Sequence, residues 1–282
     1  MSGVGRNLRR AVRSGISGYL LVVLFGSTLL ASAADGTPPA SSSVLASTPS
    51  SSSLSVPAVS LSQPSSESLV VGFMGGFVRR DARHHAEVKL MQSLREEYPK
   101  DIYFGMFENR RQGEAYAMIR ERLDTDHNGR LSDEEKQRAH ILLFGHSWGA
   151  CAVVALARRL ERDGIPVALT VQVDSVTKPF RNDRVIPANV RQAVNFYQTH
   201  GWIHGRSKIA AANPERTEIL GNFRLDYENE PAEFREYPWS ARWLMKGHIE
   251  IESDPQVWSQ VKSLLRSQLP EVMAQVEATN KP

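Results

Sequence analysis

The segment that most constrains the fold of this chain is the pentapeptide Gly-His-Ser-Trp-Gly at residues 145–149. It lies between an apolar run, Ile141–Phe144, and a helix-forming run that begins at Ala152. Glycines on both sides of a serine, between a strand and a helix, are typical of a turn so sharp that larger side chains would collide with nearby backbone. Such a turn places Ser147 Oγ above the edge of the sheet, where the first amides of the following helix also point.

Apolar and helical runs alternate along the chain around this segment. We predict strands at 69–73, 102–106, 141–144, 167–173, 193–197 and 217–225, and helices at 81–98, 115–123, 152–162 and 255–268. Val167–Val173 is almost continuously apolar and β-branched, as expected of a strand buried on both faces. Repeated strand–helix units favour an α/β fold, a three-layer α/β/α sandwich with a mostly parallel sheet. One such domain fits residues 68–282.

The N-terminal part of the chain predicts export. Residues 1–33 combine four arginines, an apolar stretch at 19–30 and an Ala-Ser-Ala ending, as in a signal peptide. The apolar stretch is too short for a comfortable membrane span, although an uncleaved anchor is the alternative. Residues 34–67 are rich in serine and proline and contain no aromatic residue, which predicts a disordered linker. We therefore expect a secreted or periplasmic bacterial protein, with no stable membrane span after cleavage.

Charge and cysteine content narrow the function classes. The whole chain has 34 Lys and Arg against 31 Asp and Glu, but four of the arginines belong to the predicted signal, which leaves 30 against 31. This balance removes the main electrostatic argument for nucleic acid as a partner. Cys151 is the only cysteine, so no intramolecular disulfide can form. An exported chain without disulfides fits a bacterial periplasm or exterior.

A serine hydroxyl becomes a nucleophile when a neutral imidazole takes its proton and a carboxylate orients the imidazole. Two residues fit these roles for Ser147. Asp174 directly follows the predicted strand 167–173, and His248 lies just before the last helix. In open α/β sheets such groups come from loops at the carboxyl ends of the strands. Other carboxylates could replace Asp174 as the acid: Asp226, Glu228 and Glu230.

From about residue 69 to 269 the chain resembles the α/β-hydrolase superfamily. The pentapeptide matches the nucleophile elbow of that family, the order serine, acid, histidine matches its triad, and Val71–Gly76 resembles its oxyanion loop. The resemblance implies oxyanion amides at Met74 (Phe73 being the alternative) and at Trp148. The oxyanion loop lacks the usual histidine before its glycine, and the acid follows the first strand after the elbow, where many members place it one strand later.

This resemblance implies an enzyme that cleaves a carboxylic ester or thioester through an acyl-enzyme. The expected partner is a small-molecule or lipid ester, with no organic cofactor. An amidase or acyltransferase with the same triad is an alternative, as is a non-catalytic calcium-binding module on the same scaffold. The sequence does not predict an oligomeric state.

A second motif, residues 124–135, resembles the calcium loop of an EF-hand. Oxygen ligands are expected at six of its positions, and Gly129 permits the sharp turn at the sixth position. These ligands are Asp124, Asp126, Asn128, the Arg130 carbonyl, Ser132 and Glu135. Because the loop precedes the strand that enters the elbow, it should lie at the sheet edge opposite Ser147, which predicts structural Ca²⁺.

The remaining histidines carry weaker predictions. His84 and His85 lie early in the first predicted helix, after the glycine loop, where a solvated helix end is the expected environment. His146 and Trp148 flank Ser147 and are expected to shape the pocket.

Overall fold

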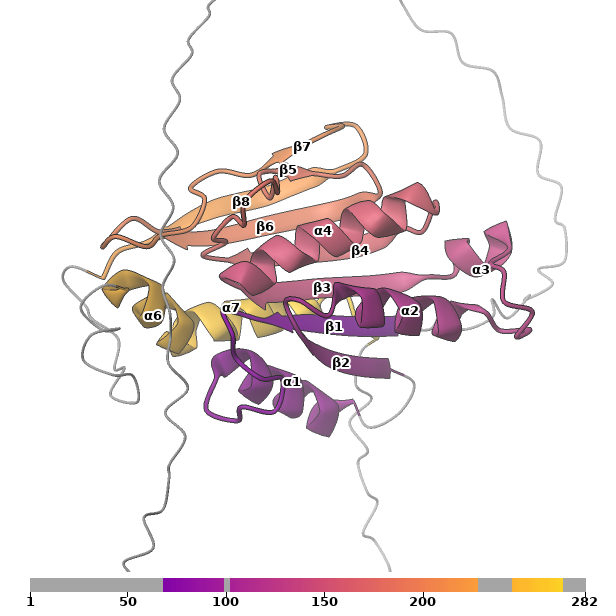
Figure 1. The fold of residues 1–282 in the computed structure, drawn as a ribbon, viewed down its shortest axis with the longest axis horizontal. Coiled ribbons are helices and arrows are strands. Elements are labelled where there is room, and N and C mark those ends of the chain that lie inside the picture. Colours follow the sequence, from indigo (N-terminus) through magenta and orange to yellow (C-terminus); the bar gives the residue numbers. More distant parts are fainter. Residues whose placement is uncertain (1–67, 99–101, 228–244, 271–282) are drawn as a thin grey trace, which may run out of the picture. The chain divides into compact units, whose positions relative to one another are not determined.

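The computed structural model describes residues 68–98, 102–227 and 245–270. Its centre is a sheet of six strands in the order β2-β1-β3-β4-β6-β8 (Figure 1). Every pairing in this sheet is parallel, which confirms the predicted α/β fold with a mostly parallel sheet. The strand bounds are β1 Ser68–Met74, β2 Ile102–Glu108, β3 His140–His146, β4 Val167–Val173, β6 Val190–Gln198 and β8 Glu218–Leu225.

Helices cover both faces of the sheet. The longer helices are α1 (Ala86–Glu97), α2 (Gln112–Leu123), α4 (Trp148–Arg162) and α7 (Pro255–Arg266). Two shorter ones are α3 (Asp133–Gln137) and α6 (Lys246–Ser253). Helices α1 and α7 pack together on one face, and α2 and α4 on the other (Figure 1). Two short strands, β5 (Val185–Ile186) and β7 (Ala210–Ala211), pair beside this sheet.

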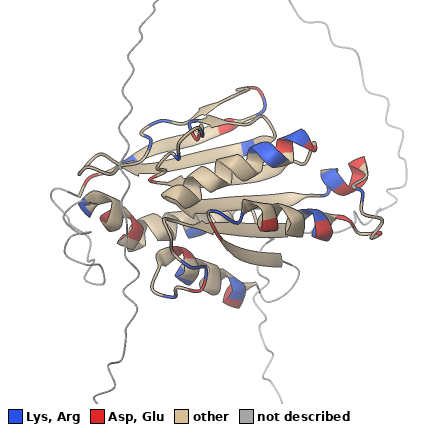
Figure 2. Ribbon diagram, viewed as in Figure 1, with Lys and Arg blue, Asp and Glu red and all other residues tan. Residues whose placement is uncertain are grey.

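The core has two halves, one on each face of the sheet, because successive side chains of a strand point to opposite faces. Val70 and Leu142 point to the side of α1 and α7, whereas Val71 and Leu143 point to the side of α2 and α4. All four are fully buried. Strands β1, β3 and β4 contain no Lys, Arg, Asp or Glu, and Figure 2 shows charge gathered on helices and loops. Burial on both faces therefore explains why these strands read as continuous apolar runs.

The structure differs from the sequence predictions at several boundaries. Helix α1 begins at Ala86 rather than Asp81, because residues 79–85 form successive tight turns and His85 has extended backbone with ψ of 141°. Helix α4 begins at Trp148, directly after the serine. Helix α6, β5 and β7 were not predicted, because a helix of 8 residues and strands of 2 residues leave little periodicity to detect.

Several predicted features lie outside the described residues. These are the signal peptide at 1–33, the linker at 34–67, and the rival acids Glu228 and Glu230. Among the residues that are described, no helix is both long and apolar enough to cross a membrane.

Candidate active site

Ser147 lies in the turn between β3 and α4, and its backbone is strained. Its φ of 57° and ψ of −125° are rare for a residue with a side chain. A Cβ added at Gly145 would lie 2.6 Å from the Gly149 carbonyl carbon, and one added at Gly149 would lie 2.1 Å from Phe73 O. Only glycine fits at these two positions, so the pentapeptide is explained by close backbone approach on both sides of the serine.

Three residues from distant parts of the chain meet at this turn. His248 Nε2 lies 2.8 Å from Ser147 Oγ, and His248 Nδ1 lies 2.6 Å from Asp174 Oδ2. All three side chains are buried. The geometry allows the serine hydroxyl to donate to Nε2 while Nδ1–H donates to the carboxylate, which is the arrangement that activates a serine.

Asp174 is held by hydrogen bonds from two further residues. Its Oδ1 accepts from Gly205 N at 2.7 Å and from Gln198 N at 3.3 Å, and its Oδ2 accepts from Gln198 Nε2 at 2.9 Å. Burial alone would raise the pKa of Asp174, but the hydrogen bonds from His248 and Gln198 outweigh it and the pKa lies below its ordinary value. The carboxylate is therefore ionised and fixed in direction.

Of the rival acids that the structure describes, Asp174 is the one that contacts His248. Asp226 lies exposed after β8. Asp174 follows β4, the strand that pairs with β3, so it emerges beside Ser147 at the same sheet edge. The loop after Asp174 is fastened by the buried Asp183, which sequence reasoning missed. Its carboxylate accepts from Ser175 Oγ at 2.6 Å, and the chain carries no motif that would have identified this contact.

His248 belongs to α6 rather than to a loop before the final helix. Its ring stacks against His146, with centroids 4.5 Å apart and planes inclined at 30°. Burial, followed by the proximity of His248, lowers the pKa of His146 to about 4. His146 is therefore neutral near pH 7 and does not compete electrostatically with a proton on His248.

The loop after β1 lies against the start of α4. The clash that a side chain at Gly149 would make with Phe73 O shows how closely these backbones approach. Asn109 Nδ2 donates to Met74 O at 3.1 Å and also to Gly76 O, which fixes the loop from β2. Met74 thus lies beside the elbow, and Trp148 is the first residue of α4, where helix amides have no partner within the helix.

Exposed aromatic side chains occur in loops at this edge of the sheet. Phe77 follows β1, Phe180 follows β4 and Trp202 follows β6, with exposed fractions of 61%, 107% and 77%. Phe77 meets Trp148 edge-on, at a centroid distance of 5.3 Å. Lys178 Nζ lies 5.1 Å from the centre of the Trp148 ring. Phe77 and Trp148 therefore place apolar surface next to Ser147.

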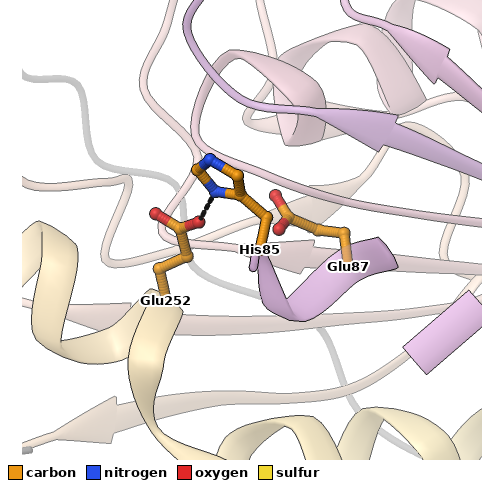
Figure 3. Close-up of side chains that lie close together, drawn as sticks. All are labelled: His85, Glu87 and Glu252. Carbon is orange, nitrogen blue, oxygen red and sulfur yellow. Dashed lines mark hydrogen bonds and ion pairs between the residues drawn. The ribbon is translucent and has the colours of Figure 1, made fainter. Parts of the chain in front are cut away.

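A second group of buried polar side chains contains His85, Glu87 and Glu252, which lie close together (Figure 3). His85 is buried and hydrogen-bonded through Nδ1 to Glu252 Oε1, so the prediction of a solvated helix end is wrong for this residue. The extended backbone at His85 turns its ring inward, whereas His84 is exposed. The histidine–carboxylate cluster consists of His85, Glu87, His146 and Glu252.

Glu87 is the most unusual member of this cluster. It is fully buried, and neither of its carboxyl oxygens has a hydrogen-bond partner among the described residues. Burial, together with the nearby Glu252 carboxylate, raises the pKa of Glu87 to about 8. Its Oε1 lies 3.8 Å from His146 Nδ1. No local sequence pattern indicates this cluster, because its members come from α1, β3 and α6.

The acidic loop at 124–135 brings three of its predicted ligands together. Ligand oxygens of Asp124, Asp126 and Glu135 lie within 4.8 Å of one another. Glu135 accepts from Ser132 N at 2.9 Å and Thr125 N at 2.7 Å. These hydrogen bonds, that from Ser132 first, lower the pKa of Glu135 to about 2. The loop lies before the start of β3, at the opposite end of that strand from the elbow (Figure 1).

The other predicted ligands also belong to this loop. Asn128 Oδ1 accepts from Arg130 N at 2.7 Å, and Ser132 Oγ caps α3 by accepting from Glu135 N at 3.2 Å. Gly129 has a φ of 78°, as the tight turn requires. A donor set made only of oxygens suits Ca²⁺.

Comparison with known proteins assigns no family to this chain. No protein-family profile matches the chain. No curated protein matches it. The chain is similar to a solved structure described as "RedJ with PEG molecule bound in the active site", with 10% identity, a TM-score of 0.39, and coverage of 72% of this chain and 90% of that one. A likeness this distant carries no argument about activity.

Proposed function

We propose that this protein is a serine hydrolase of the α/β-hydrolase type that cleaves a carboxylic ester or thioester. The observation that carries the proposal is the pair of contacts from His248, at 2.8 Å to Ser147 Oγ and 2.6 Å to Asp174 Oδ2. Ser147 is the nucleophile, His248 the general base and then acid, and Asp174 the residue that orients the imidazole.

The proposal assigns each chemical step to a residue. Ser147 Oγ adds to the carbonyl carbon while its proton passes to His248 Nε2. The amides of Met74 and Trp148 stabilise the oxyanion. Collapse of this intermediate breaks the bond to the alcohol or thiol, which leaves with the proton from His248. Water then attacks the acyl-enzyme by the same route, releasing the acid and restoring the serine.

The position of Ser147 in the sheet supports this proposal. Strand order reverses at β1 and β3: β2 lies on one side of β1, and β3, β4, β6 and β8 follow on the other. In open parallel sheets, ligands bind outside the carboxyl ends of the strands at such a reversal. Ser147 follows β3 at this point, and the proposed oxyanion loop follows β1.

The exposed aromatic residues favour a substrate with an apolar part. Phe77, which is 61% exposed, meets Trp148 edge-on at a centroid distance of 5.3 Å, directly beside Ser147. Exposed apolar side chains that touch one another beside a reactive group are typical of a binding surface. An apolar acyl or alcohol group, such as that of a lipid ester, is the partner that such a surface would take from water.

Labelling with a fluorophosphonate tests the hydrolase proposal. This probe reacts with activated serines, so the mature wild type is expected to be labelled and Ser147→Ala is not. His248→Ala should label at least about 100-fold more slowly, because general-base catalysis contributes 10²–10⁴-fold. His140→Ala, at the opposite end of β3, is the matched control and should label normally. Failure of the folded wild type to label would refute the proposal and favour the non-catalytic alternative.

A panel of esters, thioesters and amides then defines the reaction. Turnover of esters or thioesters with little amide cleavage agrees with the proposal. Preferential amide cleavage, or acyl transfer to an alcohol in place of water, would assign the same triad to an amidase or an acyltransferase.

We also propose that the 124–135 loop binds one structural Ca²⁺ and that the protein is exported with its first 33 residues removed. The gathered oxygens of Asp124, Asp126 and Glu135 support the calcium site, and the export signal rests on the sequence alone. Calorimetric titration of the calcium-free protein tests the first proposal. N-terminal sequencing of protein recovered outside the cytoplasm tests the second, with residue 34 expected first.

A further inference from the structure

A cavity of about 430 Å³ is lined by residues of α2, of α4 and of the loop between β4 and β5. Four of its lining side chains are positively charged: Arg158, Arg159, Arg162 and Arg181. The first three lie on one side of α4, because Arg162 follows the other two by three and four residues. Arg181 reaches the same cavity from the loop after β4. We refer to this cavity as the arginine pocket.

Contacts with neutral groups hold two of these arginines in place. The Arg158 guanidinium donates to the backbone carbonyls of Asn182 and Val185. The guanidinium carbon of Arg159 lies 3.6 Å from the centre of the Tyr116 ring. A guanidinium held over an aromatic ring keeps the N–H groups at its edge for another acceptor. Both side chains are therefore positioned at the pocket without losing their charge.

The positive charge of the arginine pocket is not neutralised by nearby carboxylates. In the described part of the chain, none of the four arginines forms an ion pair with Asp or Glu. Two carboxylates that act on Arg158 from a greater distance have other partners. The Asp183 carboxylate accepts from Ser175 Oγ at 2.6 Å, and Glu161 Oε1 accepts from Ala188 N at 2.7 Å.

Helix polarity explains part of this arrangement but not all of it. The last turn of a helix favours cations, which accounts for Arg159 and Arg162 on α4. It does not account for Arg181, which belongs to a different element. Burial lowers the pKa of Arg158, nearby carboxylates offset part of this shift, and Arg181 lowers the pKa further. Like charges thus converge on one cavity, and a bound anion would relieve their repulsion.

We propose that the arginine pocket binds a small phosphorylated molecule through its phosphate group. The planar donors of arginine match the oxygens of a phosphate, which they can bind in pairs. A phosphate monoester carries a charge of about −1.5 to −2 near pH 7, which suits several arginines better than the single charge of a carboxylate. Small-molecule sites have volumes of about 300–1,000 Å³, so this cavity has room for more than a phosphate group. Gln112, Ala155 and Leu156 complete its lining.

The proposal goes beyond the proposed function and does not depend on it. None of the residues that line the pocket belongs to the proposed triad or provides a proposed oxyanion amide. The phosphate monoester could belong to a soluble metabolite or to the headgroup of phosphatidic acid. Both present the same chemistry to the arginines, so the experiment has to separate them.

Isothermal titration calorimetry of the intact protein with glycerol 3-phosphate tests the proposal. The wild type is expected to bind one molecule per chain with a Kd below about 1 mM. Arg162→Ala and Arg181→Ala should each weaken binding at least about tenfold, because a hydrogen bond to a charged group is worth a factor of that size.

Two control variants belong to this titration. Arg216→Ala removes the same charge from an exposed position between β7 and β8, and should bind as the wild type does. Ser147→Ala should also bind as the wild type does, which separates the arginine pocket from the proposed active site.

Two comparisons define the ligand. Glycerate, which has a carboxylate in place of the phosphate, should bind at least about tenfold more weakly. Flotation with vesicles of phosphatidylcholine, with and without about 20% phosphatidic acid, separates the two sources of phosphate. Retention by the phosphatidic acid vesicles that is lost in Arg162→Ala but kept in Arg216→Ala would assign the phosphate to a lipid. Binding of glycerol 3-phosphate without such retention would assign it to a soluble ester, and either result agrees with the proposal.

A protection experiment on the wild type keeps the test decisive if a variant fails to fold. Phenylglyoxal modifies accessible arginines, and glycerol 3-phosphate should protect Arg162 and Arg181 from it but not Arg216, as read by mass spectrometry. A folded wild type that binds neither glycerol 3-phosphate nor the phosphatidic acid vesicles would overturn the proposal. Unchanged affinity in both Arg162→Ala and Arg181→Ala, or equal affinity for glycerate, would overturn it as well.

Discussion

Replacing Asp174 by asparagine tests the proposed triad most directly, because it keeps the shape of the side chain and removes its charge. Oδ1 accepts from the backbone amides of Gly205 at 2.7 Å and Gln198 at 3.3 Å, while Oδ2 faces His248 Nδ1 at 2.6 Å and accepts from Gln198 Nε2 at 2.9 Å. Gln198 Nε2 has a second acceptor in Ile203 O at 3.0 Å, so it can lose Oδ2 and stay hydrogen-bonded. Backbone amides cannot change from donor to acceptor, so the asparagine oxygen should occupy the Oδ1 position and its NH₂ group should face His248. The imidazole then carries its proton on Nε2 and cannot accept one from Ser147.

The cost of restoring the productive tautomer sets the size of the effect. The asparagine side-chain amide would have to rotate so that its oxygen and its NH₂ group exchange places. The NH₂ group would then face the backbone amides of Gly205 and Gln198, which leaves these two buried donors without acceptors. Each costs about 1–3 kcal/mol, so the productive state lies roughly 2–6 kcal/mol above the resting one. At about 1.4 kcal/mol per tenfold change, the rate falls by about 30-fold to 10⁴-fold. The upper end is expected, because Asp174 is fully buried and the imidazolium also loses its counter-charge.

The assay compares second-order rate constants for fluorophosphonate labelling in wild type, Asp174→Asn and Asp226→Asn, with circular dichroism to establish folding. Asp226 is the matched control, because it is an exposed carboxylate after β8 that the sequence also proposed as the acid. The reasoning is refuted if folded Asp174→Asn labels within about threefold of wild type. Loss of labelling in Asp226→Asn alone would assign the acid to Asp226.

Three further predictions follow from single contacts. Gly149→Ala should react with the fluorophosphonate at least about 100-fold more slowly, because its Cβ would lie 2.1 Å from Phe73 O. Gly113→Ala in α2 has room for its Cβ and should raise the free energy of unfolding by about 0.5–1 kcal/mol, as measured in urea. Calcium should raise the Tm of wild type but not of Asp124→Ala, as measured by scanning calorimetry. Because the pKa of Asp174 is lowered on folding, its carboxylate stabilises the fold above its unfolded pKa of about 3.9, and this stability is lost as pH falls through the lower folded pKa. As the pH is lowered below about 4, the midpoint of urea unfolding should therefore fall less steeply for Asp174→Asn than for the wild type.

The sequence was most informative where a residue's environment is set by its immediate neighbours. Ser147 could be placed in a strained turn because two glycines and the flanking runs dictate that turn locally, and its φ of 57° agrees. The seven residues Val167–Val173 coincide with β4 because a strand buried on both faces requires an unbroken apolar run. The start of α1 was misplaced because helix propensity near Asp81 gives way to turns that direct His85 inward.

Contacts between distant elements could not be predicted in the same way. The histidine–carboxylate cluster joins residues up to 167 positions apart in the sequence, and of its four members His146 alone belongs to a motif, the pentapeptide at 145–149. His85 was expected to be solvated because two adjacent histidines near a helix start are usually exposed. Its burial depends on α6, which supplies Glu252 and which has too short a pattern to be recognised from sequence. The same limit applies to Asp183, whose contacts organise the loop after the acid.

The geometry of the sheet explains why residues placed by local sequence and residues placed by long-range contacts depend on each other. Ser147 and Asp174 follow adjacent parallel strands, which stand only about 4.8 Å apart, so both were predictable from their strands alone. Neither strand can supply the imidazole that must lie between them. That group comes from α6, whose place over the sheet edge is fixed partly by Glu252 four residues after His248. The positions of the proposed nucleophile and acid are therefore set by local sequence, whereas that of the histidine between them depends on the long-range cluster that includes Glu252.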